Sequence, residues 1–361
     1  MTDAAPEATA DVVPGEITVT GLAQRQAWLD RDLPPIEQLR TDLWSIPVPI
    51  PNNPLRYTSA YAFAGPGGLT LIDCGWESEG GWDALVKGLA EIGGSIDDVR
   101  GVLVTHMHFD HIGLAGRVRE ASGAWIALHA ADRDILAHPE YRVPETAGAR
   151  RVAWLRYLGA PEEEIATIAR PDSFERMSRV ALPDRLLEDG ERADVPGWSL
   201  FAVHTPGHTP GHLCFADGER RLFFAGDHVL PRITPNISAS ALGSRDPLGQ
   251  FLTSLRAVRS RLAEEVMPAH EWRFRGLAER VDQLLAHHKA RLEETLRAVE
   301  EHPGSPPWEL ASHLTWSRSW DQYGGHLRSQ AVGETTAHLW HLVTLGRVVC
   351  TGDPGIYNPT A

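Results

Sequence analysis

The chain has 361 residues and 42% hydrophobic content, so we expect one large domain with an appendage, because a single core rarely grows past about 300 residues. Its 48 acidic and 34 basic residues give a formal net charge of −14, which argues against nucleic acid as a partner of the whole chain. No apolar run approaches the roughly 20 residues that cross a bilayer, so we expect no membrane-spanning helix.

The N-terminus and the cysteines favour a cytoplasmic protein. Residues 1–20 are predicted to form a disordered tail, since the first 15 are rich in Ala, Asp, Glu and Pro and lack the basic and apolar regions of a targeting signal. Cys74, Cys214 and Cys350 are widely spaced and odd in number. They argue against a disulfide framework and fit a reducing compartment.

Strands and helices alternate along most of the chain. Apolar runs bounded by Gly and Pro predict strands, and apolar residues at helical spacing predict helices. The expected strands are residues 43–48, 57–64, 69–72, 102–104, 125–128, 198–203, 213–216, 222–225, 265–267 and 347–350. The expected helices are residues 82–92, 114–122, 130–137, 151–158, 162–169, 247–262, 276–301, 308–314 and 331–345.

Three regions follow from this pattern after the tail. Residues 21–275 form the expected catalytic domain, which is an α/β fold, and residues 276–361 form a separate, mostly helical C-terminal module. Residues 138–195 are too long for an ordinary connection in an alternating domain. We expect this helical insert to serve as a lid or binding wall, with a buttress remote from the chemistry as the alternative.

The stretch His106-x-His108-x-Asp110-His111 is the strongest chemical signal in the chain. It follows a buried strand, so His106 and His108 project to the same side if the extended chain continues past the strand. That pair can grip one metal ion. Asp110 and His111 follow where the chain turns into a helix, which suits a second ion beside the first. Imidazole and carboxylate are ligands that zinc prefers.

Further Asp and His residues also follow apolar strands and lie beside a Gly or Pro that sharpens the turn. They are Asp73, His208, Asp227 and His270. Taken singly each is a weak signal. Their order along the chain and their partnership with His106–His111 give them weight.

In this order the residues resemble the metallo-β-lactamase superfamily, over roughly residues 40–275. The resemblance implies an αββα four-layer sandwich with two zinc ions at the rim between the sheets, with iron or manganese as other candidates. It implies that His106, His108 and His208 hold one ion, that Asp110, His111 and His270 hold the other, and that Asp227 bridges them. An aspartate at the bridging position is similar to the glyoxalase-II-like branch, whereas true β-lactamases have a cysteine there.

The resemblance also suggests roles around the ligands. Asp73 would accept the free N–H of a ligand histidine and fix its tautomer, unless it only caps the turn before Gly75. Asp110 is the candidate catalytic residue, because a ligand with a free oxygen can position the attacking water or carry its proton. Tyr57, Arg232 and Asn236 are the candidate substrate contacts, and Arg232 could meet a carboxylate or phosphate. Ordinary loop roles are the alternative for these three.

The C-terminal module resembles the winged-helix-like domain of the lactamase-β-2-like subfamily, on residues 281–301, 307–311 and 331–340. A winged helix invites a nucleic-acid interpretation. Residues 276–361 carry seven Lys and Arg against ten Asp and Glu, with no basic stripe, so nucleic acid is an improbable partner. We expect a packing or homodimerisation element.

The resulting hypothesis is a binuclear zinc hydrolase in which hydroxide attacks a small-molecule ester, thioester or lactone. The alternative is a phosphodiesterase or ribonuclease that uses the same metal site, because this scaffold hosts many reactions. A third hypothesis is a binding protein without catalysis. The complete set of seven candidate ligands argues against it.

Overall fold

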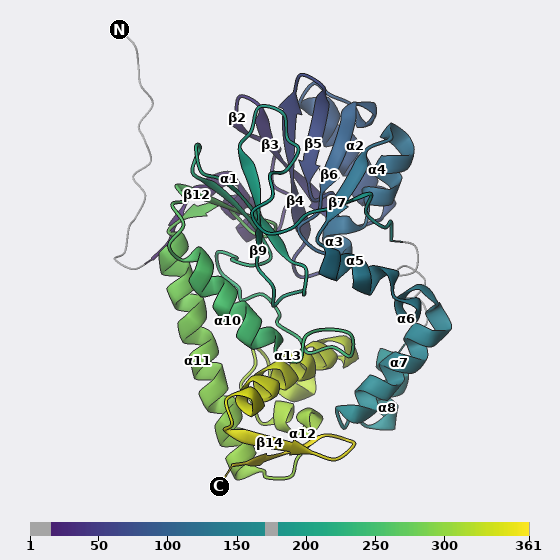
Figure 1. Cartoon of the computed structure of the whole chain (residues 1–361), viewed down its shortest axis with the longest axis vertical. Coiled ribbons are helices and arrows are strands. Elements are labelled where there is room, and N and C mark those ends of the chain that lie inside the picture. The colour runs from purple at the N-terminus through teal and green to yellow at the C-terminus, as the bar shows by residue number, and fades with distance from the viewer. Residues whose placement is uncertain (1–15, 170–179, 361) are drawn as a thin grey trace.

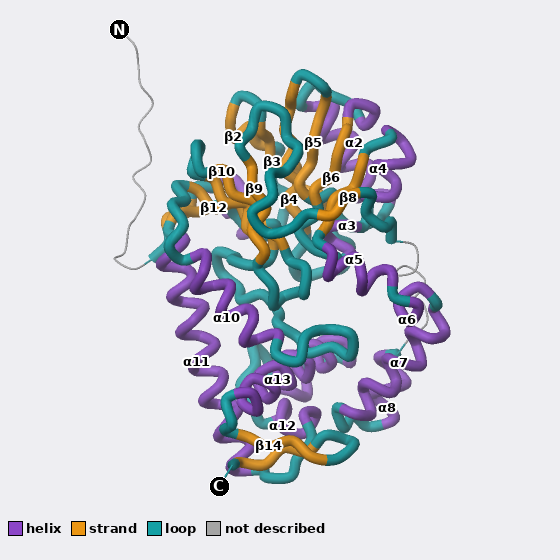
Figure 2. The backbone as a smooth tube through the Cα atoms, viewed as in Figure 1, coloured by secondary structure: helices purple, strands orange, loops and turns teal. Residues whose placement is uncertain are grey.

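The computed structural model describes residues 16–169 and 180–360, and in these residues two β-sheets lie together between layers of helices (Figure 1). Figure 2 shows the strands of both sheets in the upper half of the molecule, and mostly helices, with the β14 strand, in its lower half. The predicted α/β sandwich is therefore present. None of the described helices is long and apolar enough to cross a membrane.

The larger sheet has seven strands among the described residues, in the order β2-β3-β4-β5-β6-β7-β8. The first four pair antiparallel and the last four pair parallel. Their bounds are β2 Glu37–Arg40, β3 Leu43–Pro49, β4 Tyr57–Gly65, β5 Gly68–Ile72, β6 Val99–Leu103, β7 Trp125–Leu128 and β8 Arg185–Leu186.

The smaller sheet has six described strands, in the order β1-β13-β12-β11-β10-β9. Only β11 and β12 pair in parallel. Their bounds are β1 Thr18–Val19, β9 Leu200–His204, β10 Leu213–Asp217, β11 Leu222–Gly226, β12 Glu265–Pro268 and β13 Phe274–Arg275.

Alternation of side chains along the strands builds the layers. In β4, Tyr61 and Phe63 pack in the cluster between the sheets, where Phe224 of β11 meets both rings at 5.1 and 5.4 Å. Ala60 and Ala62 face the opposite side, with the helices α2 (Glu79–Glu91) and α4 (Ala115–Ser122). The larger sheet therefore buries both of its faces at β4.

The outer face of the smaller sheet is covered by α10 (Pro247–Val258) and by the long helix α11 (Leu277–Glu301). Phe223 of β11 packs there in one cluster with Phe251 and Leu284. The same cluster continues into the C-terminal residues, so α11 joins the sandwich to the module that follows.

The C-terminal module contains α11, α12 (Pro307–Ser312), α13 (Gly325–Thr344) and an antiparallel hairpin of β14 (Val348–Thr351) and β15 (Ile356–Pro359). Its mostly helical character agrees with the expectation. Sequence patterns missed β15 and began α13 too late. Figure 1 shows the module at the lower end of the molecule.

Residues 138–195 contain α6 (Pro139–Arg142), α7 (Pro144–Tyr157) and α8 (Glu162–Ile168), after α5 (Ala130–Ala137). The expectation of a helical insert up to residue 195 is wrong at its end, because β8 pairs with β7 in the larger sheet. Residues 170–179 of the expected insert lie outside the described residues. Leu155 and Ile165 pack with Trp308 and Val332 of the module, and Arg328 of α13 forms an ion pair with Glu164. The described insert helices therefore pack on the C-terminal module, and a role as a lid stays a prediction.

The boundary of the N-terminal tail at residue 20 needs correction. Thr18–Val19 forms β1 and pairs with β13, and the N–H groups of Thr20 and Gly21 both donate to the carbonyl of Arg273 at 3.0 Å. The helix α1 (Leu22–Asp30), absent from the expected elements, follows directly. The rest of the predicted tail, residues 1–15, lies outside the described residues.

Candidate metal centre

All seven candidate ligands follow the ends of strands at one edge of the sandwich. His106 and His108 lie in the loop after β6, and Asp110 and His111 lie in the short helix α3 (Phe109–Ile112). The other three are His208, Asp227 and His270, which follow β9, β11 and β12. The larger sheet thus supplies the first four and the smaller sheet supplies the rest.

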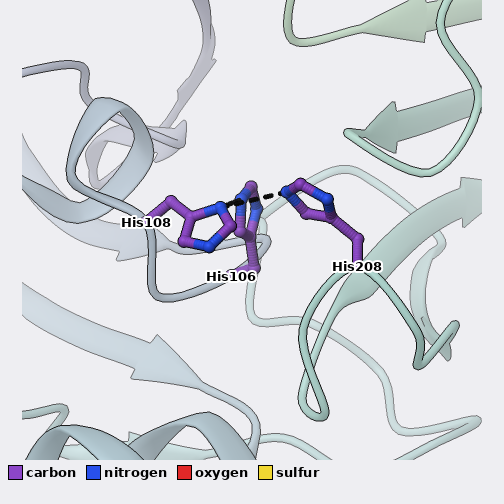
Figure 3. Close-up of side chains that lie close together, drawn as sticks. All are labelled: His106, His108 and His208. Atoms are coloured by element: carbon purple, nitrogen blue, oxygen red, sulfur yellow. Dashed lines mark hydrogen bonds between the residues drawn. The ribbon is translucent and has the colours of Figure 1, made fainter. Parts of the chain in front are cut away.

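His106, His108 and His208 point their ring nitrogens at one another (Figure 3). The Nδ1 of His108 lies 2.9 Å from Nε2 of His106 and 3.0 Å from Nε2 of His208. His106 is fully buried and His108 is partly buried, and their rings meet edge to face at 4.6 Å. Three nitrogens that converge in this way can hold one cation.

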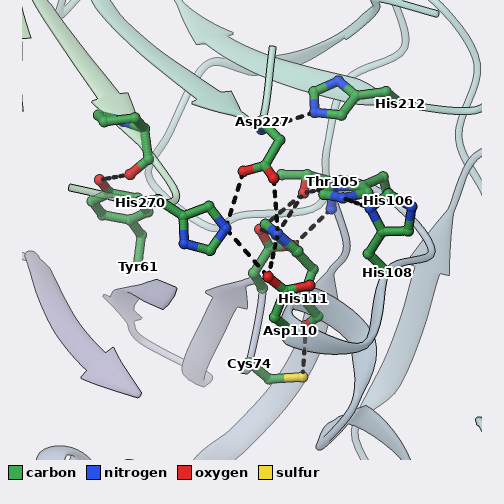
Figure 4. A network of polar contacts seen from close by, with 12 residues as sticks. Tyr61, Cys74, Thr105, His106, His108, Asp110, His111, His212, Asp227 and His270 are labelled. Carbon is green, nitrogen blue, oxygen red and sulfur yellow. Dashed lines mark hydrogen bonds and ion pairs between the residues drawn. The ribbon is translucent and has the colours of Figure 1, made fainter. Parts of the chain in front are cut away.

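Asp110, His111 and His270 form the second group (Figure 4). The Nε2 of His270 lies 3.3 Å from Oδ2 of Asp110 and 3.3 Å from Oδ1 of Asp227. The Nε2 of His111 lies 3.8 Å from Oδ2 of Asp110 and 3.6 Å from Oδ2 of Asp227. Oδ2 of Asp227 is also 3.6 Å from Nε2 of His208, so Asp227 faces both groups.

Groups behind the ligands fix the direction of three rings. The Nδ1 atoms of His208 and His270 donate to the carbonyls of Asn236 (2.9 Å) and Tyr57 (2.8 Å). Nδ1 of His111 lies 2.8 Å from Oδ2 of Asp73. A neutral imidazole that donates through Nδ1 keeps its lone pair on Nε2. All three Nε2 atoms therefore face the centre of the cluster.

Unpaired atoms in the cluster fit a bound cation. Nε2 of His111, Nε2 of His270 and Oδ1 of Asp227 are buried and have no hydrogen-bond partner among the described residues. The contacts of 3.3 Å at His270 are ion-pair distances without hydrogen-bond geometry. Buried polar atoms are nearly always paired, so these three indicate a partner of another kind. Nitrogen and carboxylate donors are the set that zinc takes.

The electrostatics of the first group favour neutral rings. Burial, and then the neighbouring His208, lower the pKa of His108 to about 3. Burial and the nearby histidines hold the pKa of His106 well below its usual value, and burial lowers the pKa of His208. At neutral pH these rings carry lone pairs without first losing a proton.

The second group behaves in the opposite way. Burial favours a neutral His270, but the carboxylates of Asp227 and Asp110 outweigh it and raise its pKa to about 10. Burial is likewise outweighed at His111, whose pKa is raised by Asp73 and Asp227. The pKa of Asp110 is held low by His111 and His270 in spite of burial. Without a bound cation, protons on His111 and His270 balance the charge of the carboxylates in this group.

Asp132 of α5 is a buried residue that sequence reasoning missed. Its Oδ2 accepts from the N–H of Met107 at 2.9 Å and from the hydroxyl of Thr209 at 2.7 Å, and its Oδ1 accepts from the N–H of Gly211 at 2.6 Å. Met107 lies between two ligands and Thr209 follows a third. Asp132 therefore connects the loop after β6 to the loop after β9.

His212 supports the cluster in a similar way. Its Nε2 accepts from the N–H of Asp227 at 3.1 Å, and its Nδ1 lies 2.8 Å from Oγ1 of Thr205. The ring thereby holds the backbone at Asp227 in place. His212 lies four residues after His208 in the sequence, but its hydrogen bond to the N–H of Asp227 is visible only in the structure.

Two of the three candidate substrate residues, Tyr57 and Asn236, contact candidate ligands, and Arg232 contacts Glu271, the residue after His270. The hydroxyl of the buried Tyr57 donates to the carbonyl of Glu271, and Arg232, half exposed, forms an ion pair with the Glu271 carboxylate. Tyr57 and Asn236 contact ligand histidines through their carbonyls, and the Asn236 side chain accepts from the Ser238 hydroxyl at 2.9 Å. Their contact with a substrate stays a prediction.

The fold and the cluster of candidate ligands at its edge point to one protein family, and comparison with known families identifies it. The sequence profile of the metallo-beta-lactamase superfamily matches residues 53–270, which is more than half of the chain. The chain belongs to the metallo-beta-lactamase superfamily, and its relatives include hydrolases.

Individual relatives agree. A metallo-beta-lactamase family protein from Thermus thermophilus superposes with a TM-score of 0.76 and 31% identity, over 90% of this chain and 100% of that one. A lactamase-like protein of Aspergillus niger is 27% identical over 77% of this chain and 70% of its own length. A hydroxyacylglutathione hydrolase of Haemophilus influenzae is 27% identical over 53% of this chain and 72% of its own.

Proposed function

We propose that the protein hydrolyses a small-molecule thioester, ester or lactone with two zinc ions. His106, His108 and His208 would hold one ion, Asp110, His111 and His270 would hold the other, and Asp227 would face both. Bound zinc would supply an activated water and polarise the acyl oxygen. The observation that carries this proposal is the pair of donor groups, each with its ligand atoms within 4.8 Å of one another.

Asp110 is the proposed catalytic residue. Its side chain is 14% exposed, more than the 9% of Asp227, so it is the carboxylate of the cluster with better access to an incoming molecule. His111 and His270 keep its pKa low, so it is ionised at neutral pH. An ionised oxygen can orient the attacking water, accept its proton and return that proton to the leaving group.

The substrate class rests on relatives. The Haemophilus influenzae relative is named for a thioester of glutathione, and a thioesterase of Paecilomyces divaricatus that acts on an acyl carrier protein is 32% identical over 32% of this chain. Thioesters are therefore the first substrates to test. No amino acid nucleophile is required, because water is the attacking group.

The test is a screen of thioesters, lactones, phosphodiesters and RNA with zinc-loaded wild type and Asp110→Asn. We expect thioester or lactone turnover, which Asp110→Asn lowers by about 10²- to 10⁴-fold while zinc content is measured in parallel. Asp134→Asn, an exposed acid in α5 with a side chain 69% exposed, is the control and should keep full turnover. Turnover of RNA alone would overturn the substrate class, and zinc-loaded protein that cleaves nothing would overturn the hydrolase proposal.

We also propose a winged-helix-like organisation for residues 276–361 and a cytoplasmic location. Three helices followed by the β14–β15 hairpin support the first. The free thiols of Cys74, Cys214 and Cys350 support the second, because disulfides are rare in the reducing cytoplasm.

A further inference from the structure

The segment of residues 230–239 lies between the metal cluster and the C-terminal module. It follows β11 and Asp227, and it supplies the carbonyl of Asn236 that accepts from Nδ1 of His208 at 2.9 Å. The position of this carbonyl decides where Nε2 of His208 points. We refer to residues 230–239 as the His208 support segment.

The first part of the support segment is held by Arg280 of α11. Its Nε donates to the carbonyl of Leu230 at 2.6 Å and its Nη2 donates to the carbonyl of Ile233 at 2.8 Å. Arg280 is only 7% exposed. A buried guanidinium with two donors on two carbonyls fixes this stretch of backbone in one conformation.

The last part of the support segment is held by Gly333 of α13. The N–H of Ala239 donates to the Gly333 carbonyl at 3.0 Å. A Cβ at position 333 would lie 2.8 Å from Oγ and 3.2 Å from Cβ of Ser238. Glycine within a helix costs about 1 kcal/mol relative to alanine. Here its missing side chain lets the support segment approach the helix.

Ser238 links this contact to Asn236. The Ser238 hydroxyl donates to Oδ1 of Asn236 at 2.9 Å, one residue before Ala239 meets α13. A continuous path therefore runs from Gly333 through Ser238 and Asn236 to His208. Its other end, Nε2 of His208, lies 3.0 Å from Nδ1 of His108.

From these contacts we propose that the C-terminal module positions the metal ligand His208, with Arg280 and Gly333 as positioning residues. The inference rests on the proposed function only in that the three histidines bind a metal ion. A module that merely packs against the sandwich would contribute stability and leave the metal geometry unchanged. A module that positions His208 would affect both the stability and the geometry of the bound metal ion.

The experiment titrates metal-free protein with cobalt(II), whose visible absorption bands report the geometry of its ligands. The variants are Gly333→Ala, Gly333→Ala with Ser238→Gly, and Arg280→Met. Val299→Ala is the matched control, because Val299 is buried in the same helix as Arg280 but lies 19 residues, or about 28 Å, along it. Urea unfolding of each protein gives its stability.

We expect Gly333→Ala and Arg280→Met to raise the cobalt dissociation constant about 10- to 100-fold, the usual effect of disturbing groups behind metal ligands, and to shift the visible bands. Adding Ser238→Gly removes the atoms that an alanine at 333 would meet, but it also removes the hydroxyl that donates to Asn236, so it should restore only part of the affinity. Val299→Ala should lower stability and leave the bands unchanged.

Wild-type affinity and bands in Gly333→Ala would overturn the inference, as would loss of affinity in Val299→Ala that matches its loss of stability. Should Arg280→Met fail to fold, the comparison of Gly333→Ala with the Gly333→Ala, Ser238→Gly double variant tests the inference by itself. Wild type that takes up no cobalt would refute the proposed metal site itself, and the inference with it. Normal uptake in every variant would refute only the inference.

Discussion

Oδ2 of Asp73 lies 2.8 Å from Nδ1 of His111, and both side chains are fully buried. Oδ1 of the same carboxylate accepts from the N–H of Thr105 at 2.8 Å. Asp73 thereby ties the start of the ligand loop to a ligand ring and directs Nε2 of His111 toward Asp110 and Asp227.

Asp73→Asn should weaken zinc binding about 10- to 100-fold, because an amide cannot both accept from Thr105 and hold the proton on His111 with the strength of a carboxylate. Competition with a zinc indicator measures this loss. The exposed Asp97→Asn serves as control. Equal zinc affinities in Asp73→Asn and wild type would show that Asp73 is only a turn residue.

Zinc affinity at the two donor groups should depend differently on pH. In His208→Ala the group of Asp110, His111 and His270 remains, and there a cation must displace protons, because the pKa of His270 is about 10 and that of His111 is raised. Affinity should therefore rise with pH from 6 to 8, about tenfold per pH unit for each proton displaced.

His270→Ala leaves the group of His106, His108 and His208, whose rings are already neutral, since the pKa of His108 is about 3. Its zinc affinity should change little over the same pH range. Calorimetric titrations of both variants in buffers of different ionisation enthalpy count the protons released. Identical pH slopes for the two variants would contradict this assignment.

Asp132→Asn should destabilise the protein by about 1–3 kcal/mol, because one accepting oxygen becomes a donor that faces other donors. The buried carboxylate has a pKa of about 6, raised by burial, so it is ionised and accepts from all three donors at pH 7.5. Urea unfolding measures the change. Asp134→Asn in the same helix should stay within about 0.5 kcal/mol of wild type, and a similar result for Asp132→Asn would disprove its bridging role.

Zinc should raise the free energy of unfolding, since an ion that binds only the folded chain stabilises it by mass action. At free zinc 100-fold above the dissociation constant, one site contributes about 2.7 kcal/mol. Thermal unfolding with and without a chelator shows this difference in wild type. It should shrink in His106→Ala, and an undiminished effect there would place the zinc elsewhere.

The convergence of the seven candidate ligands could be predicted because their order along the chain resembles that of a known family, and each follows a strand at the same edge of the sandwich. No sequence pattern distinguishes Asp132, because it is one acidic residue in a helix and its three hydrogen-bond donors come from two distant loops. The hydrogen bond that orients His208 could not be predicted from the sequence either, because its acceptor is the backbone carbonyl of Asn236.

Non-local pairing explains the errors at the N-terminus. Thr18–Val19 has no partner nearby in sequence and pairs only with Phe274–Arg275, more than 250 residues later. The helix α1 leaves Leu22 and Leu29 exposed, so its apolar residues do not mark a buried face. Hydrophobic patterns over a few neighbouring residues therefore do not predict β1 or α1.

The number of zinc ions bound per chain at equilibrium tests the central claim most directly. Dialysis of metal-free protein against zinc, followed by elemental analysis, should give two ions for wild type and fewer for Asp227→Ala, because Asp227 faces both donor groups. Wild type that binds no zinc, or full binding by Asp227→Ala, would contradict the account.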